Sequence, residues 1–283
     1  MGLQYKVFYS RRPGVNRSVP AGHDHLKWVP SSSTLIYGEI DAALIDTPLT
    51  IEAGKQLVEW VVASGKNLTQ IYVTHAHGDH FFGCAALLQE FPKAKVLATK
   101  EVVVRMEQEI RPERLNSFWA RLFPGEIPTG LVTAEPLPID EFELEGEKLV
   151  VVRTGHTDTD DTTALWVPSI GLVVTGDSVY NNTHPYLGES GSKQKRLEWI
   201  ASLDKIAALK PDFVVGGHSD PSKGHSPAAI GETKSYLQDF EHFHEITTTV
   251  DELYYRMLEK HPDRLNPGSL WGAATTVKNA SQV

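Results

Sequence analysis

Short apolar runs alternate with amphipathic segments over the first half of the chain. Residues 34–39 and 42–48 are two β-rich runs, and their spacing predicts a hairpin. Residues 51–64 carry apolar side chains at helical spacing. Strand-like runs at 71–73 and 94–99 flank a further amphipathic stretch. Strand, helix and strand in alternation are typical of α/β layering, so we expect an α/β fold.

The second half of the chain continues this alternation. Three successive strands are expected at residues 148–153, 162–167 and 171–177. A helix is expected next, and its buried stripe is formed by Leu197, Ile200, Leu203 and Ile206. Residues 213–221 make the last clear strand, residues 228–260 one or two helices, and residues 266–283 a tail without a clear pattern. The first 29 residues, interrupted by prolines and glycines, are expected to be irregular.

Residues 100–137 interrupt the alternation of strands and helices. Their sequence predicts two helical segments divided at Pro112, followed by a loop. Such an insertion between core strands is a candidate lid over a pocket, with an apolar face formed by Phe118, Trp119, Leu122 and Phe123. Packing of these side chains on the body of the domain is the alternative. We expect one domain over residues 1–283, with this helical insertion and C-terminal helices at about 228–260.

Composition narrows the classes of function. A chain of 283 residues with 41% hydrophobic and 22% charged residues is typical of a soluble globular protein. It has no apolar run of about eighteen residues, and its single cysteine, Cys84, excludes an intramolecular disulfide. The first residues lack the apolar segment of a secretory signal, so we expect none. We therefore expect a cytoplasmic protein and interpret Cys84 as a small core residue. The formal charge of −9 argues against nucleic acid and anionic membranes, so we expect a small-molecule substrate.

The densest polar motif is THAHGDH, which directly follows an apolar run. Alternation along a strand places His75 and His77 on one face, and a turn at Gly78 carries Asp79 and His80 to a second face. One short loop can therefore serve two metal ions. The alternative is a polar turn whose histidines only bond backbone groups, which suits a lone histidine better than this cluster.

Three further candidate ligands, His156, Asp177 and His218, lie at the ends of later strands. THAHGDH, TGHTDTDDTT, VTGDSVY and VGGHSD together resemble the metallo-β-lactamase superfamily over about residues 34–220. The resemblance implies an αββα four-layer sandwich with two metals at one edge of the sheets. It also implies the ligands: His75, His77 and His156 for the first zinc, Asp79, His80 and His218 for the second, and Asp177 as the bridge. Such ligands suit zinc, although the same set can hold iron or manganese.

Asp46 has two interpretations. ALIDTP resembles a LIDTG-like segment of the same superfamily, in which the aspartate supports the metal loop. Alternatively, Asp46 caps the helix that begins near residue 51.

The resemblance implies a metal-dependent hydrolase. Zinc lowers the pKa of bound water from roughly 16 to about 7, so hydroxide is available to attack a carbonyl. Tyr180 follows Asp177 by three residues, as in the lactone-hydrolysing branch, and is either a donor to the oxyanion or a buried structural residue. Asp79 is a candidate proton donor to a departing nitrogen. We therefore expect hydrolysis of a small lactam or lactone, with His184 and Tyr186 as further pocket residues.

Three other activities share parts of this pattern. A glyoxalase II-like thioesterase has the same metal set, but residues 228–260 show no clear cationic patch for its substrate. A phosphodiesterase of the superfamily is disfavoured by the acidic charge. A di-iron redox protein requires an electron donor and an extra carboxylate, and the pattern lacks both.

Overall fold

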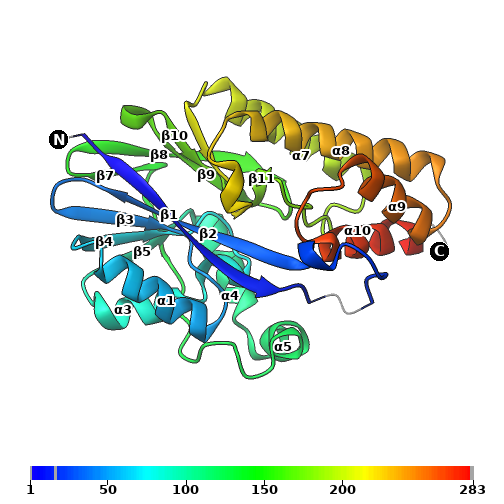
Figure 1. The fold of residues 1–283 in the computed structure, drawn as a ribbon. Helices are drawn as coiled ribbons and strands as arrows, with labels where there is room; N and C mark the ends of the chain where they lie inside the picture. The colour runs from blue at the N-terminus through cyan, green and yellow to red at the C-terminus, as the bar shows by residue number, and fades with distance from the viewer. Residues whose placement is uncertain (1, 16–17, 281–283) are drawn as a thin grey trace.

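The computed structural model describes residues 2–15 and 18–280 and contains two β-sheets that face each other (Figure 1). The first sheet has the order β1 (Gln4–Pro13), β2 (Trp28–Tyr37), β3 (Asp41–Ile45), β4 (Asn67–Tyr72), β5 (Lys95–Ala98) and β6 (Glu135–Pro136). The second has the order β12 (Phe213–Val215), β10 (Leu172–Val174), β9 (Thr162–Val167), β8 (Glu147–Gly155) and β7 (Glu141–Leu144). A short parallel pair is formed by β11 (Tyr180–Asn181) and β13 (His218–Ser219).

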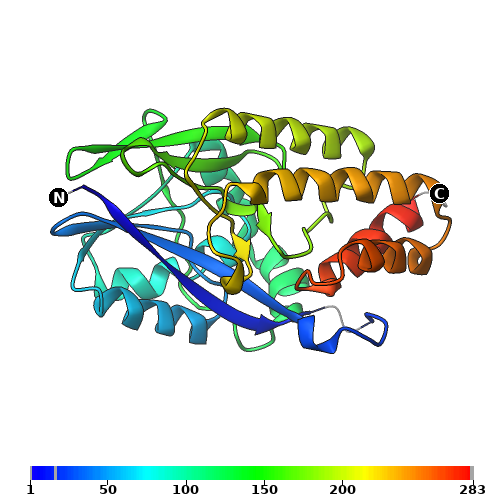
Figure 2. The same ribbon diagram turned by 45° about the horizontal axis from the view of Figure 1, so that its top comes forward.

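Helices cover the outer face of each sheet (Figures 1 and 2). On the first sheet lie α1 (Ile51–Val62), α3 (Cys84–Glu90) and α4 (Lys100–Glu109), and on the second lie α7 (Lys193–Ala208) and α8 (Ala228–Ile246). The chain ends in α9 (Val250–Lys260) and α10 (Pro267–Ala280). The layers confirm the predicted αββα sandwich. No helix in the described part of the chain is long and apolar enough to cross a membrane.

Three buried apolar clusters fill the three interfaces between these layers. Alternation along β2 sends Leu35 to the helix side of the first sheet and Ile36 to the side that faces the second sheet. In β3, Leu44 and Ile45 divide in the same way. The cluster between the second sheet and its helices includes Trp199. Full burial of a leucine or isoleucine side chain stabilises the fold by about 1.5–3 kcal/mol.

Residues 4–13 form a regular strand, so the expectation of an irregular N-terminal segment was wrong for these residues. β1 pairs antiparallel with β2 along its whole length, beginning with Gln4 opposite Tyr37. The alternation of Tyr5, Val7 and Tyr9 is the sequence signal for this strand. Since β1 is the edge strand of its sheet, the proline at its end is tolerated and marks only its boundary.

The buried face of α7 differs from the expected stripe. Leu197 is 50% exposed, whereas Arg196 and Trp199 are buried. Arg196 is tolerated inside because its guanidinium donates to the carboxylate of Glu241 and to the carbonyl of Ser190. A buried arginine with a carboxylate and a carbonyl as acceptors therefore takes the inward position that was expected for Leu197.

The C-terminal segment forms α10 instead of a tail without pattern. Small residues dominate PGSLWGAATTVKNA, so the contrast between its two faces is weak in the sequence. Proline at the first helical position is favourable, and Leu270, Ala274 and Val277 are buried against the neighbouring helices.

The insertion contains the predicted helical pieces divided at Pro112. After α4 the chain forms α5 (Pro112–Arg114), a π-helical turn (Leu115–Trp119) and α6 (Ala120–Leu122). Trp119 and Phe123 are buried in the cluster that lies against the first sheet. Trp119 and Phe123 therefore pack on the body of the domain.

Candidate metal centre

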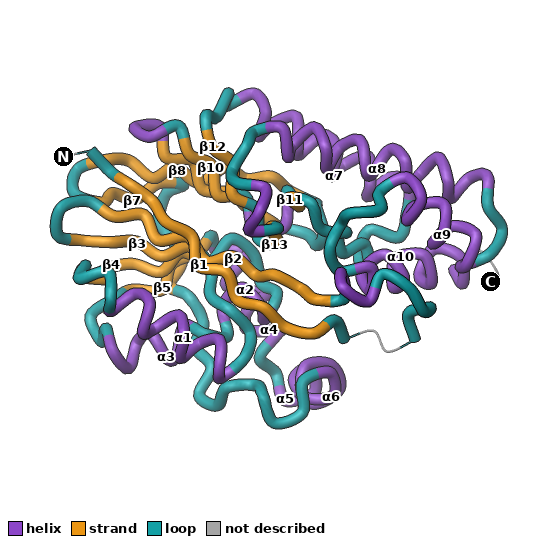
Figure 3. Tube along the Cα trace, viewed as in Figure 1, coloured by secondary structure: helices purple, strands orange, loops and turns teal. Residues whose placement is uncertain are grey.

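The candidate ligands gather at one end of the two sheets. The motif THAHGDH connects β4 to α2 (Gly78–Phe81), and Asp46 directly follows β3. His218 begins β13, which pairs with β11 shortly after Asp177. Figure 3 shows α2 and the β11 and β13 pair at the same end of the sheets. Segments far apart in the sequence therefore contribute to one region.

Asp46 fixes the orientation of two imidazoles. Its Oδ2 lies 2.9 Å from Nδ1 of His80 and accepts the Thr74 hydroxyl at 2.7 Å, while Oδ1 accepts the Thr74 amide at 2.8 Å. Because that hydroxyl donates to Asp46, its oxygen accepts from Nδ1 of His75, 3.1 Å away. Nδ1 of both imidazoles therefore faces outward as a donor, and Nε2 faces the interior. Asp46 supports the metal loop, and Thr50 caps α1 instead.

The imidazoles of His77 and His218 are held in the same way. Nε2 of His77 lies 3.0 Å from Oε1 of Glu189, and Nδ1 of His218 lies 2.5 Å from the carbonyl oxygen of Pro30. Glu189 is fixed in turn by the hydroxyl of Thr159, at 2.7 Å. All four imidazoles thus bind an acceptor with the outer nitrogen and direct the inner nitrogen into the cluster, as metal-binding histidines commonly do.

Asp177 joins two of these imidazoles. Its Oδ1 lies 3.2 Å from Nε2 of His80, and its Oδ2 lies 3.3 Å from Nε2 of His218. Oδ2 of Asp79 lies 3.5 Å from the same nitrogen of His218. The structure therefore brings together the three residues predicted for the second metal and the residue predicted to bridge the two metals.

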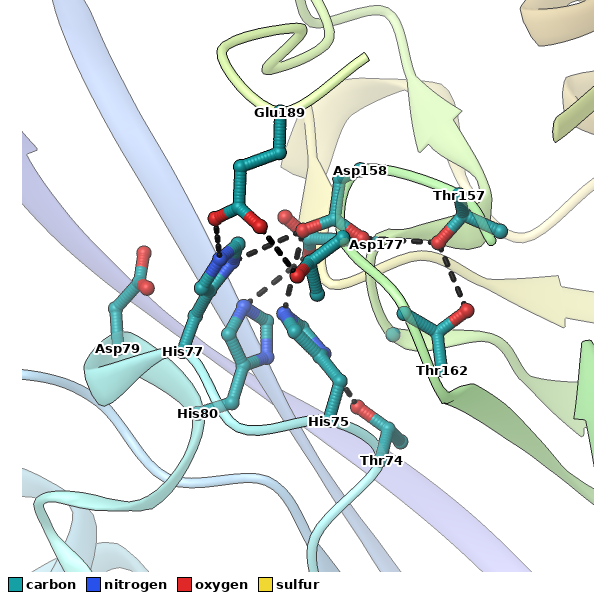
Figure 4. A network of polar contacts seen from close by, with 12 residues as sticks. Thr74, His75, His77, Asp79, His80, Thr157, Asp158, Thr162, Asp177 and Glu189 are labelled. Carbon is teal, nitrogen blue, oxygen red and sulfur yellow. Dashed lines mark hydrogen bonds and ion pairs between the residues drawn. The ribbon is translucent and has the colours of Figure 1, made fainter. Parts of the chain in front are cut away.

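The first predicted group is assembled around a different residue. Nδ1 of His77 and Nε2 of His75 converge on Oδ2 of Asp158, at 2.9 and 3.5 Å (Figure 4). His156 is turned away from them, and within the described residues no group of converging ligand atoms includes it. The structure thus does not bring His156 into the first group, and the loop after β8 turns Asp158 toward the two imidazoles.

Several atoms at the centre of the clusters are buried without a hydrogen-bond partner among the described residues. They are Nε2 of His75, Nε2 of His80, Oδ2 of Asp158 and Oδ1 of Asp177. Buried polar atoms without partners are costly, and each such atom requires a physical explanation. Imidazoles and carboxylates are the donors that first-row divalent metals prefer. The residues therefore fit a site for two divalent cations.

The two carboxylates of the second group are held in their charged form. Burial alone would raise the pKa of Asp177, but the imidazoles of His218 and His80 outweigh burial and keep it well below its ordinary value. In the same way, His80, His218 and Arg12 outweigh burial and lower the pKa of Asp79 to about 2. Ionised carboxylates at the centre of the cluster are ready to bind a cation without first losing a proton.

Two glycines allow this close approach. A Cβ on Gly217 would lie 2.2 Å from Oδ1 of Asp177 and 2.8 Å from Cε1 of His80. A Cβ on Gly176 would lie 2.3 Å from the hydroxyl oxygen of Thr74. Residues with side chains at these positions would displace the groups that form or orient the cluster.

Tyr180 lies beside the cluster, with its hydroxyl donating to Oδ2 of Asp177. Its ring stacks on that of His218, with the ring centroids 5.5 Å apart. Burial and the nearby Asp177 carboxylate raise the pKa of Tyr180 well above its ordinary value, so the hydroxyl stays protonated. The residue is therefore a neutral donor at the edge of the site.

A cavity of about 510 Å³ opens above the clusters. Its lining includes ligand residues of the second group together with four predicted pocket residues, Phe118, Trp119, Phe123 and Tyr186. The prediction of His184 as a pocket residue was wrong. This side chain has no exposed surface and lies outside the lining, with Nδ1 2.9 Å from the hydroxyl oxygen of Tyr236.

Sequence reasoning missed several residues of the site. Asp158 and Glu189 contact the imidazoles, and Arg12 reaches the cavity from β1. α10 forms another wall through its small residues, among them Gly268, Gly272 and Thr276. Only Asp158 had a local signal, since it lies inside the motif TGHTDTDDTT. The others are brought to the site by tertiary packing.

The αββα sandwich and the histidine and aspartate clusters at one end of its sheets define a metal-dependent hydrolase class. Residues 26–218 match the family described as the Metallo-beta-lactamase superfamily, and the chain belongs to this superfamily. The metallo-beta-lactamase type 2 of Bacteroides fragilis is 25% identical over 195 residues, covering 68% of this chain and 70% of that protein. The hydroxyacylglutathione hydrolase of Erythrobacter litoralis (strain HTCC2594) is 28% identical over 175 residues, covering 62% and 56%.

Solved structures share the fold. A metallo-beta-lactamase family protein from Thermus thermophilus superimposes with a TM-score of 0.64 at 21% identity, covering 98% of this chain and 93% of that one. A metallo-beta-lactamase from Pontibacter korlensis has a TM-score of 0.60 at 18% identity, covering 84% and 95%.

Proposed function

We propose that the chain is a hydrolase that binds two divalent cations and opens a small cyclic amide or ester. The observation that carries this proposal is the set of four imidazoles, each bound at its outer nitrogen and directed inward at the other, around Asp79 and Asp177 at the base of a cavity. Bound divalent cations would polarise a carbonyl oxygen and lower the pKa of water to about 7. Zinc is the first candidate, with manganese or iron as alternatives.

Asp79 and Tyr180 are the proposed proton-handling residues on the cavity side. The Asp79 carboxylate lies between His218 and Arg12, at 3.5 and 3.6 Å, and lines the cavity. From there the ionised carboxylate would first accept a proton from the attacking water and then pass it to a departing nitrogen or oxygen. The Tyr180 hydroxyl would stabilise negative charge on a substrate oxygen. Alternatively, its hydrogen bond to Asp177 would hold that carboxylate in place.

The cavity supports a small, partly apolar ring as substrate. Phe118, Trp119, Phe123 and Tyr186 supply aromatic surface, on which a planar ring can pack. Arg12 supplies a cation above the clusters: its Nε and Nη1 are buried and have no hydrogen-bond partner within the described residues. A lactam or lactone that carries an anionic group matches both features.

A thioester is the second candidate substrate, because a curated relative is named a hydroxyacylglutathione hydrolase. A leaving thiolate needs no protonation, so a thioesterase would depend less on Asp79 than a lactamase would. Removing the Asp79 carboxylate would also disturb the second metal group, so the two reactions are separated by which class of substrate the wild-type protein turns over.

The test is a hydrolysis screen of lactams, lactones, thioesters and phosphodiesters with protein stripped of metal and reloaded with zinc. We expect turnover of a lactam or lactone, loss of at least a hundredfold in His77→Ala, and unchanged turnover in His242→Ala, which removes an exposed histidine on α8. Hydrolysis of thioesters alone would favour the second candidate. Bound iron together with oxygen consumption and no hydrolysis would contradict both.

A further inference from the structure

We propose that the substrate carries two anionic groups, one bound by Arg12 and the other by Arg114, and that its apolar part packs on the aromatic wall of the cavity. Phe118, Trp119 and Phe123 form this wall, and both arginines line the cavity with them. The inference rests on the proposed function, because it concerns the molecule that the same cavity admits. It adds Arg114 as a second recognition residue and specifies the substrate as a dianion.

The charged residues of the cavity lining are of two kinds. Asp79 and Asp177 belong to the candidate metal centre, where bound cations would balance their charge. Among the described residues of the lining, Arg12 and Arg114 are the other two that carry a charge. The chain as a whole has a formal charge of −9. Two arginines in one cavity of an acidic protein therefore indicate a site that attracts anions.

Arg12 is the inner of the two cations. Its side chain is 19% exposed, and Nη2 lies 3.6 Å from Oδ2 of Asp79. Its guanidinium carbon lies 4.9 Å from the centroid of the Phe123 ring. Nε and Nη1 are buried and find no acceptor in the part of the chain that the structure describes. Buried donors without partners are costly, and an anionic oxygen of a bound molecule would supply the acceptor.

Arg114 is the outer cation and belongs to a different element, α5. Its side chain is 36% exposed, and its guanidinium lies over the ring of Phe118, 4.0 Å from the centroid. Nε donates to both carboxylate oxygens of Glu109, at 3.1 and 3.0 Å, and Glu109 also accepts the indole N–H of Trp119 at 2.5 Å. These contacts hold the guanidinium through one nitrogen only.

The two terminal nitrogens of Arg114 form no hydrogen bond with any residue that the structure describes. They are therefore free to bind one anionic group through two parallel hydrogen bonds, the geometry in which arginine recognises carboxylates. Because Glu109 offsets the charge of Arg114, we expect this second contact to contribute less to affinity than the contact with Arg12.

The aromatic wall separates the two guanidiniums. The ring centroid of Trp119 lies 5.0 Å from that of Phe118 and 6.2 Å from that of Phe123. Each guanidinium lies over a different phenylalanine, and Trp119 contacts both phenylalanines. A molecule that binds both arginines must therefore extend past Trp119, where a planar ring can pack. The anionic groups of the substrate would lie at opposite ends of this ring system.

The test measures the binding of unreactive dianions, so it does not depend on turnover. The probes are benzene, naphthalene and biphenyl disulfonates with the sulfonates at opposite ends, each compared with its monosulfonate by titration calorimetry. Sulfonates bind zinc weakly, so their affinity reports mainly on the arginines. Zinc-loaded wild-type protein is compared with Arg12→Gln, Arg114→Gln and the control Arg121→Gln, whose side chain is exposed on α6 and does not line the cavity.

We expect the wild type to bind at least one disulfonate about threefold to tenfold more tightly than its monosulfonate. Arg114→Gln should remove this preference and leave monosulfonate binding unchanged, because Arg12 still binds the single anionic group. Arg12→Gln should weaken the binding of both probes by about 10–100-fold. Arg121→Gln should behave like the wild type.

Two outcomes would overturn the proposal: equal affinity of the wild type for every disulfonate and its monosulfonate, or an Arg114→Gln variant that keeps the preference. Arg114 is partly exposed, so this second result can be obtained even if Arg12→Gln does not fold, which circular dichroism shows. Disulfonate binding as expected, together with no hydrolysis in the substrate screen, would contradict the proposed function alone. Hydrolysis of neutral or singly charged rings without any preference for disulfonates would contradict only the dianionic substrate.

Discussion

Asp46 orients the imidazole of His80 directly, through a 2.9 Å contact between Oδ2 and Nδ1. It orients the imidazole of His75 through the hydroxyl of Thr74. His80 belongs to the second cluster and His75 to the first. A single carboxylate that lies outside both clusters therefore orients one imidazole in each. Such outer contacts typically change metal affinity by about 10–100-fold.

Replacement of Asp46 by asparagine should weaken both metal equivalents. The amide group cannot accept hydrogen bonds at both positions, so either Thr74 or His80 loses its acceptor. Asparagine tolerates the positive φ of this residue, +59°, so added backbone strain is small. We expect a loss of about 10–100-fold in the affinity for Zn²⁺, measured by titration against a competing chelator.

Asp161→Asn is the matched control, because Asp161 has the same φ of +59° but pairs with Arg105 at the surface. It should leave metal affinity unchanged. Equal losses in the two variants would mean that the backbone, and not the contact with His80, is responsible.

Replacement of Gly217 by alanine should remove metal binding without unfolding the chain. The added Cβ would lie 2.2 Å from Oδ1 of Asp177, so either the carboxylate or the loop must move. Gly231→Ala in α8 is the control, since nothing lies within 4 Å of its Cβ, and it should stabilise the protein by up to about 1 kcal/mol. Metal analysis and urea unfolding measure both effects. Full metal content in Gly217→Ala would contradict the close packing described for this loop.

Replacement of Arg12 by glutamine should reduce selectivity for anionic substrates. The guanidinium lies over the ring of Phe123, 4.9 Å from its centroid, with two nitrogens unpaired within the described residues. A hydrogen bond to a charged group contributes about 1.5–3 kcal/mol, so KM for an anionic substrate should rise about 10–100-fold. KM for its neutral ester should change little.

Arg11→Gln is the neighbouring control, because Arg11 stacks on Trp28 and does not line the cavity. Steady-state kinetics on the paired substrates distinguish the two variants. An equal rise in KM for the acid and the ester would indicate a loss of shape and not of charge recognition.

Cys84 should resist thiol reagents in the native protein. Burial raises the pKa of its thiol from 9.0 to about 12, so the reactive thiolate is scarce at pH 8. Because the folded state favours the protonated form, this contribution to stability is constant below pH 9 and falls as the pH rises toward 12. Labelling with a chromogenic disulfide should therefore require denaturant at pH 8. Rapid labelling without denaturant would show that the helix carrying Cys84 opens locally.

The metal loop could be predicted because its information is local. The spacing of His75, His77, Asp79 and His80 is set by one strand end and one turn, and any fold that buries the strand presents them together. Asp177 and His218 also follow from their positions at strand ends. The αββα layering follows from the alternation of strands and helices along most of the chain.

The orientations of His156 and Asp158 in this structure could not be predicted from the sequence. Both residues lie in one short loop. His156 is held by contacts with Ser190 and Asp160, and Asp158 is held by its contact with His77. Sequence patterns give the position of a side chain along the chain but not its rotation in a tight turn.

β1 and α10 were missed for different reasons. Val7 and Tyr9 do alternate in β1, but the prolines and glycines of the region outweighed this short signal. In α10 the residues that face the cavity are small, because the helix approaches it closely, and small residues give a weak periodic pattern. Leu197 illustrates the same limit in α7, where a buried arginine took the place expected for an apolar residue.

Part of the cavity wall lies outside the segment that matches the superfamily. Every candidate ligand lies within residues 26–218, the segment that matches the superfamily, whereas Arg12 and the face of α10 lie outside it. Part of the shape of the binding site is therefore encoded outside the segment that carries the candidate ligands. Substitutions in the first strand and the last helix can change which molecule enters while every side chain that would hold a metal stays the same.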